Sequence, residues 1–123
     1  NAKSLLALAP DRPSIAGRVG ALLTAAFQGG GIPTAEQAAR ELNMSVRSLH
    51  RGLEVEATTY RELVDQLRHE RSAALLADSR YSIAEIGYLL GFSEISSFYR
   101  AFKRWTDQTP AEFRARALDN EPA

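Results

Sequence analysis

Apolar residues recur every three or four positions along most of the chain, beginning at Ile15. A repeat of about 3.6 residues places them on one face of a helix, where they can pack against a core. No short stretch alternates apolar and polar residues in the manner of a strand. The pattern therefore predicts an all-α fold.

Capping residues and helix breakers divide the chain into seven predicted helices. Serine and threonine oxygens accept hydrogen bonds from the first free N–H groups of a helix, whereas glycine, asparagine and proline end helices or separate them. The predicted helices run from about Ile15 to Gln28, from Thr34 to about Leu42, from Ser45 to about Val55, from Thr59 to about Asp78, from Ser82 to Gly91, from Ser93 to about Trp105, and onward from Thr109.

These helices predict one domain over residues 14–117, followed by a short tail over residues 118–123. Pro10 and Pro13 restrict the backbone and remove hydrogen-bond donors. We therefore expect residues 1–13 to be a linker from an upstream domain.

The fourth predicted helix has about 20 residues and a length of about 30 Å. Its periodicity predicts inward positions at Leu63, Val64, Leu67, Ala74 and Leu75, and outward positions at Arg61, Asp65, Arg68 and Glu70. The arginines Arg61 and Arg68 are expected to form solvated ion pairs with the neighbouring carboxylates of Glu62 and Asp65.

A two-helix pattern occurs twice in the chain. Thr34 aligns with Ser82 and Asn43 aligns with Gly91 at the same spacing, and the match continues into the following helix after a shift of one residue. The repeat joins the second and third predicted helices to the fifth and sixth.

Both copies carry the features of a helix-turn-helix. A small residue, Ala39 or Gly87, lies four positions before a residue that tolerates left-handed backbone, and an apolar residue and a serine follow. One copy alone is weak evidence, since any helical hairpin needs similar features. The length of the fourth helix is close to the roughly 34 Å between successive major grooves on one face of DNA. The helix could therefore hold the two copies in adjacent major grooves, or its length could be accidental.

Composition narrows the possible partners. The 123 residues include 15 Lys and Arg against 15 Asp and Glu, so the formal net charge is zero. This balance argues against a protein that coats nucleic acid or an anionic membrane as a general polycation. Basic residues are nevertheless concentrated between residues 98 and 116. The chain has no cysteine and no apolar run that could span a membrane, which favours a cytoplasmic protein without membrane partners.

No motif supports catalysis or metal binding. The sequence lacks a nucleophile elbow and a phosphate-binding glycine loop, and the pair His69-Glu70 lacks the second histidine of a zinc-protease motif because Ala73 stands there. Most aromatic residues lie between Tyr81 and Phe113, at positions that predict core packing. We expect neither enzymatic activity nor a cofactor.

The most specific stretch of the chain runs from Ser82 to Ser93 and continues through Phe98, Arg100-Ala101-Phe102-Lys103-Arg104-Trp105 and Thr109-Pro110 to Phe113-Arg114. This stretch resembles the C-terminal DNA-binding domain of the AraC/XylS family of bacterial transcription regulators. Ala38 to Ser45, with Leu49, His50 and Arg51, resembles that family's first helix-turn-helix. The resemblance implies seven helices, two helix-turn-helix units and a helix that joins them.

The resemblance also implies which residues contact double-stranded DNA. The positions that match base-reading residues are Arg47, Ser48, His50 and Arg51 on the third helix, and Ile95, Ser96, Tyr99 and Arg100 on the sixth. The candidates for phosphate contacts are Ser97, Lys103, Arg104 and the helix starts at Thr34, Ser82 and Thr109. By resemblance alone, RNA polymerase and an upstream effector-binding or dimerisation domain are further partners.

Two residues depart from the family pattern or carry unfavourable charge. Gly52 stands where many relatives have a larger residue, which softens the helix and predicts a lost phosphate contact. Glu94 either favours the dipole of the sixth helix or accepts a hydrogen bond from a cytosine amino group.

With few phosphate contacts, we expect weak DNA binding and a salt slope much shallower than about −8. The alternative function is a helical protein-interaction module.

Overall fold

The computed structural model describes residues 14–29 and 31–119, and this part of the chain contains helices and no strand. The predicted all-α fold is confirmed. The elements in chain order are α2 (Ile15–Gln28), α3 (Ala35–Glu41), α4 (Val46–Val55), α5 (Tyr60–Leu76), α6 (Ile83–Leu89), α7 (Ile95–Thr106) and α8 (Pro110–Asp119). The expected linker over residues 1–13 lies outside the described residues.

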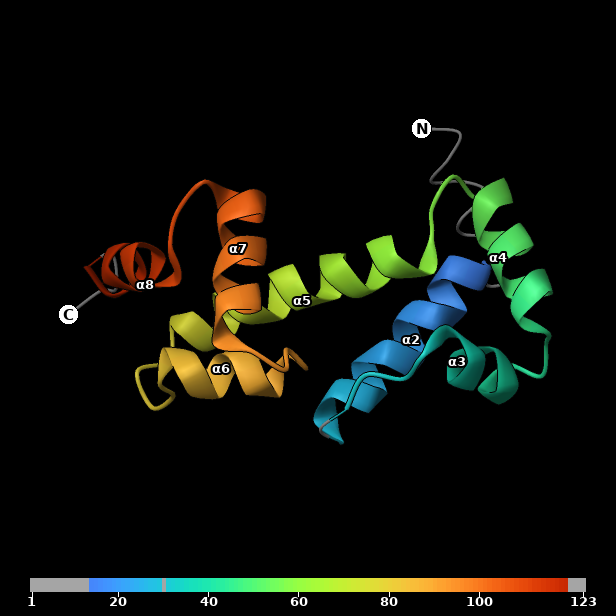
Figure 1. Cartoon of the computed structure of the whole chain (residues 1–123), viewed down its shortest axis with the longest axis horizontal. Helices are drawn as coiled ribbons and strands as arrows, with labels where there is room; N and C mark the ends of the chain where they lie inside the picture. The colour runs from blue at the N-terminus through green and yellow to red at the C-terminus, as the bar shows by residue number, and fades with distance from the viewer. Residues whose placement is uncertain (1–13, 30, 120–123) are drawn as a thin grey trace.

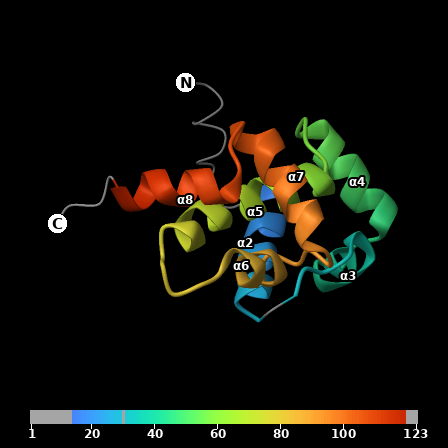
Figure 2. The same ribbon diagram turned by 60° about the vertical axis from the view of Figure 1, so that its left-hand side comes forward.

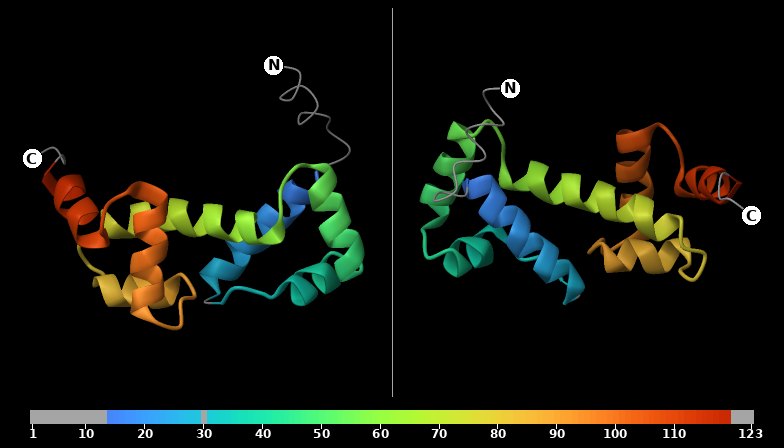
Figure 3. Two further views of the ribbon diagram at one scale, coloured as in Figure 1. Left: turned by 45° about the horizontal axis from the view of Figure 1, so that its top comes forward. Right: turned by 180° about the vertical axis from the view of Figure 1, so that it is seen from behind.

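The long helix α5 joins two groups of helices. Helices α2, α3 and α4 form the first unit at one end of α5, and α6, α7 and α8 form the second unit at the other end (Figure 1). Figure 2 shows α7 in front of α5, and Figure 3 shows α5 lying between the two units from two further directions. The molecule is therefore a pair of small helical units on a shared helix.

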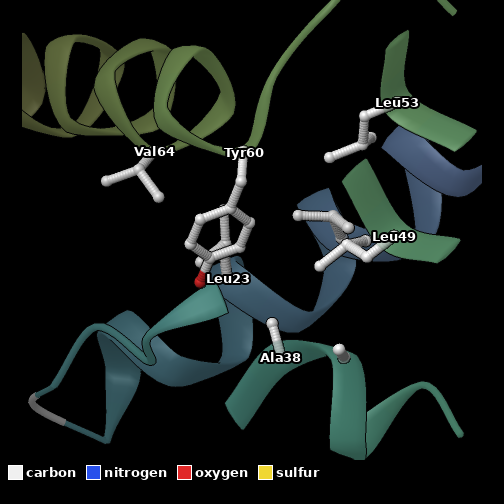
Figure 4. Close-up of a cluster of buried hydrophobic side chains, with 8 residues drawn as sticks. Leu23, Ala38, Leu49, Leu53, Tyr60 and Val64 are labelled. Carbon is white, nitrogen blue, oxygen red and sulfur yellow. The ribbon is translucent and has the colours of Figure 1, made fainter. Parts of the chain in front are cut away.

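The first unit has a core of mainly aliphatic side chains. Figure 4 shows Leu23 of α2, Ala38 of α3 and Leu49 of α4 converging on Tyr60 and Val64 of α5. The Tyr60 hydroxyl donates a hydrogen bond of 2.6 Å to the Pro33 carbonyl oxygen, and burial raises the pKa of this hydroxyl. The start of α5 is thus packed into the first unit.

The second unit has an aromatic core. Phe102 contacts Phe98 and Phe113 edge to face, with ring centroids 5.9 Å and 5.3 Å apart. The fully buried residues of this cluster are Leu76, Ile86, Leu90, Phe98 and Phe102, with Phe92, Trp105 and Phe113 packed against them. The prediction that these aromatic residues form core contacts is confirmed.

The turns of both units have the predicted backbone. Asn43 and Gly91 adopt positive φ angles of 59° and 89°. The predicted capping boxes at Thr34 and Ser82 are also present, as is the cap at Ser45. At Gly87, an added Cβ would lie 3.4 Å from the Phe98 ring, so the small residue allows α6 and α7 to approach closely.

Three predicted details of the helices are wrong. The N-cap of α7 is Glu94 rather than Ser93, and the helix begins at Ile95. Helix α5 has 17 residues, which corresponds to about 25 Å rather than about 30 Å. Ala74, expected to face inward, is exposed. Helix α8 ends at Asp119.

Candidate nucleic-acid interface

The candidate base-reading residues of α4 share one exposed face. Leu49 and Leu53 are buried in the first core and fix the helix on its inner side. Arg47, Ser48, His50 and Arg51 are all exposed on the remainder of the helix. The structure therefore brings these four candidates together on an accessible surface.

Helix α7 has the same division. Phe98, Ala101 and Phe102 are buried, whereas Ile95 and Tyr99 are 40% and 38% exposed. Ser96 and Arg100 are exposed as well, and the Arg100 guanidinium donates a 3.4 Å hydrogen bond to the Ser97 hydroxyl. All four α7 candidates are thus accessible while the aromatic core anchors the helix.

Helices α4 and α7 run roughly parallel to each other in Figures 1, 2 and 3, one near each end of the joining helix. Each is the second helix of its helix-turn-helix, held by the positive-φ turn that precedes it. Two parallel helices with exposed polar faces are the arrangement that can enter two grooves of one duplex.

The helix starts proposed as phosphate contacts are already hydrogen-bonded. The Thr34 N–H donates to the Gln37 side chain at 2.9 Å, and the Ser82 N–H donates to the Glu85 carboxylate at 2.7 Å. Hydrogen bonds from the Ser82 backbone and side chain lower the pKa of Glu85. At Thr109, the N–H donates to the Glu112 carboxylate at 2.8 Å. A phosphate would therefore have to use other amides of these first turns.

Two basic candidates on α7 have partners within the chain. The Lys103 ammonium donates to the Asp107 carbonyl oxygen at 3.0 Å, at the end of its own helix. The Arg104 guanidinium lies 3.6 Å from the Asp65 carboxylate of α5. Both side chains are exposed, and the remaining candidate, Ser97, is half-buried. Lys103 and Arg104 also hold parts of the fold in place.

Gly52 lies beside another helix of the first unit. This residue is half-buried against α2, and an added Cβ would lie 2.2 Å from the Ile15 Cδ1 atom. Glu56, at the end of α4, accepts hydrogen bonds of 2.9 Å from the Ile15 and Ala16 N–H groups. Gly52 therefore lies where α4 packs on the start of α2, and the lost phosphate contact expected there stays a prediction.

Glu94 is the N-cap residue of α7, but its side chain makes no capping hydrogen bond. Its carboxylate is exposed at the edge of the candidate interface. The two roles expected for this carboxylate, with the helix dipole or with a cytosine amino group, stay predictions.

Glu94→Asp should stabilise the domain by about 0.5–1 kcal/mol, because the shorter aspartate reaches the free N–H groups of the first turn. The free energy of unfolding in urea measures this gain. Glu94→Gln, which supplies no cap, is the control, and a stability of Glu94→Asp at or below that of the control would contradict the prediction.

Sequence reasoning missed two arginines that hold the second unit together. Arg68 was expected to face solvent, but its Nε donates to the Leu90 carbonyl oxygen at 3.0 Å and its guanidinium lies 4.2 Å from the centre of the Phe92 ring. Burial lowers the pKa of Arg68, and the Asp65 carboxylate 3.9 Å away opposes that shift. Arg68 therefore fixes the α6–α7 turn to α5.

Arg114 of α8 acts in the same way on the other side of this unit. Its guanidinium donates to the carbonyl oxygens of Leu76, Asp78 and Tyr81 at 2.9, 3.2 and 2.6 Å. These bonds join the end of α5 and the loop before α6 to α8. No local sequence pattern predicts these hydrogen bonds or the contact with the Phe92 ring, because those partners lie far from the two arginines along the chain.

Within the described ranges, no group of three His, Cys, Asp or Glu side chains could hold a metal ion. In that same part of the chain, no helix combines the length and the apolar character needed to cross a membrane.

The matches to known proteins agree with this geometry. A family described as "Helix-turn-helix domain" matches residues 38–116. The ornithine utilization regulator of Pseudomonas aeruginosa is 39% identical over 112 residues, which cover 91% of this chain and 32% of the regulator. The HTH-type transcriptional regulator VqsM of the same organism is 44% identical over 82 residues, which cover 67% of this chain and 25% of VqsM. The chain thus spans about a third or less of these curated relatives.

Solved structures share the architecture. The DNA-binding transcriptional dual regulator from Escherichia coli K-12 superposes with a TM-score of 0.83 at 25% identity, covering 89% of this chain and 97% of that one. The transcriptional regulator CdpR from Pseudomonas aeruginosa gives a TM-score of 0.77 at 39% identity, covering 82% of this chain and 31% of CdpR. The chain belongs to the AraC/XylS family of helix-turn-helix transcription regulators and corresponds to its DNA-binding domain.

Proposed function

We propose that this domain recognises a specific promoter sequence by inserting α4 and α7 into successive major grooves on one face of the duplex. The observation that carries the proposal is the parallel placement of these two helices, each buried on its apolar side and exposed at its candidate base-reading residues. Arg47, Arg51 and Arg100 suit guanine, because a guanidinium can donate two hydrogen bonds to its O6 and N7 atoms.

The joining helix contributes to the distance between the two recognition helices. Helix α5 has 17 residues and spans about 25 Å, less than the roughly 34 Å between successive major grooves. Helix α4 lies beyond the first turn of α5 in Figure 1, so the separation of α4 and α7 also depends on how each unit packs on α5.

In the full-length protein, we expect this domain to act in the cytoplasm beside an effector-binding or dimerisation domain and to contact RNA polymerase. The curated relatives are three to four times as long as the matched region, which leaves room for such a domain. The domain itself is expected to need no cofactor and to catalyse no reaction.

Selection of the purified chain against random duplex DNA at low salt tests the proposal. Enrichment of two short blocks about one helical turn apart is the expected result. The Arg51→Ala, Arg100→Ala double variant should lose this enrichment while remaining folded.

A protein-interaction module would give a different result. Folded wild-type chain that enriches no sequence, alone and within the full-length protein, would contradict DNA recognition. The exposed Tyr88 and Leu89 of α6, 68% and 45% accessible, would then be the first surface to examine for a protein partner.

A further inference from the structure

A groove of about 450 Å³ lies between α5 and α7, on the side of α5 where the two units approach each other. Ile32, from the segment before α3, lies at its edge together with Tyr60 from the start of α5. The polar and charged residues that line the groove are Arg61, Asp65, Arg68, Ser97, Arg100 and Arg104.

The groove is strongly positive although the chain as a whole has no net charge. Four guanidinium groups face one carboxylate, a net charge of +3. The Asp65 carboxylate is already shared between Arg68 at 3.9 Å and Arg104 at 3.6 Å. This local excess of positive charge attracts an anion.

Arg61 is the residue of this groove with the least structural role. It is exposed, and no carboxylate among the described residues lies within ion-pair distance of it. It is the second residue of α5, where a positive charge opposes the helix dipole. Helix stability therefore does not account for an arginine at this position. Arg68 and Arg104, in contrast, each lie near the Asp65 carboxylate.

The groove is continuous with the candidate DNA interface. Arg100 lines the groove and also belongs to the exposed face of α7, and the half-buried Ser97 lines the groove beside it. Between two successive major grooves on one face of B-DNA lies a minor groove bordered by two phosphate backbones. A domain that places α4 and α7 in those major grooves turns the surface between them toward this backbone.

From this placement we propose that the groove binds a backbone phosphate of the DNA segment between the two major grooves, with Arg61 and Arg104 as its donors. The Asp65 carboxylate lies 3.6 Å from the Arg104 guanidinium and positions it in the groove. The inference rests on the proposed DNA-binding function and adds a contact that reads no base. It predicts that Arg61 contributes to affinity for every sequence alike.

The test compares Arg61→Gln with Arg71→Gln, which removes an arginine of the same helix outside the groove. Dissociation constants are measured for the whole chain on the selected duplex and on a duplex of unrelated sequence, across a range of salt concentrations. Arg61→Gln should weaken both about five-fold and reduce the magnitude of the salt slope by about 1, while the ratio of the two affinities stays constant. Arg71→Gln should change neither.

Three results would overturn the inference. Unchanged affinity and salt slope for Arg61→Gln, with binding by the wild type intact, would remove the phosphate contact and leave the proposed function standing. A change in the ratio of affinities would indicate base reading by Arg61. Stabilisation of the free chain by inorganic phosphate, lost in Arg61→Gln without any change in DNA binding, would show that the groove takes free phosphate. Absence of DNA binding by the wild type would instead contradict the proposed function.

Discussion

Phe102→Ala should destabilise the domain by about 3–5 kcal/mol, the usual cost of removing a buried phenyl group. Phe102 is fully buried and contacts both Phe98 and Phe113 edge to face. No other side chain can close the resulting cavity without moving these rings. We expect the loss to be concentrated in α6, α7 and α8.

The expected localisation follows from the two separate cores. The first unit packs around Leu23, Leu49 and Leu53, none of which belongs to the aromatic cluster. Amide hydrogen exchange of Phe102→Ala should therefore show lost protection in the second unit and retained protection in α3 and α4. Equal loss in both units would show that they unfold as one. Tyr88→Ala, at a side chain 68% exposed, is the control and should change stability by less than about 0.5 kcal/mol.

The second large effect concerns DNA binding. Arg51→Ala and Arg100→Ala should each weaken binding to the selected duplex by about 1–3 kcal/mol, roughly 5- to 150-fold. Both arginines are exposed, on α4 and α7 respectively. Because the helices belong to different units, each substitution should relax base preference in only one of the two blocks.

Competition between the selected duplex and duplexes altered in one block at a time measures this division. Arg71→Ala, outside both candidate faces, is the control. If Arg51→Ala and Arg100→Ala leave both affinity and base preference unchanged in folded protein, direct base reading by these residues is wrong.

Local features of the chain could be predicted from its sequence. The capping boxes at Thr34 and Ser82 and the positive-φ turns at Asn43 and Gly91 all formed as expected. Each of them depends on residues within a few positions of one another, so one segment of sequence contains all the necessary information. The candidate base-reading residues of α4 and α7, which the family resemblance implied, are exposed in the structure.

Features that depend on distant partners could not be predicted in this way. Arg68 lies on the polar side of its own helix, yet it folds over the Phe92 ring of another segment. Gly52 is explained only by Ile15, which approaches from a different helix. His69 is half-buried and stacks on Trp105 of another helix. Helical periodicity specifies which side a residue faces but not what other segment arrives there.

The stacking of Trp105 on His69 also gives the protein an intrinsic fluorescent probe. Trp105 is the single tryptophan of the chain, and its ring centroid lies 5.4 Å from that of His69 on α5. It belongs to the second unit, whereas the buried aromatic residue of the first core is Tyr60. Indole emission therefore reports on the packing of α7 against α5.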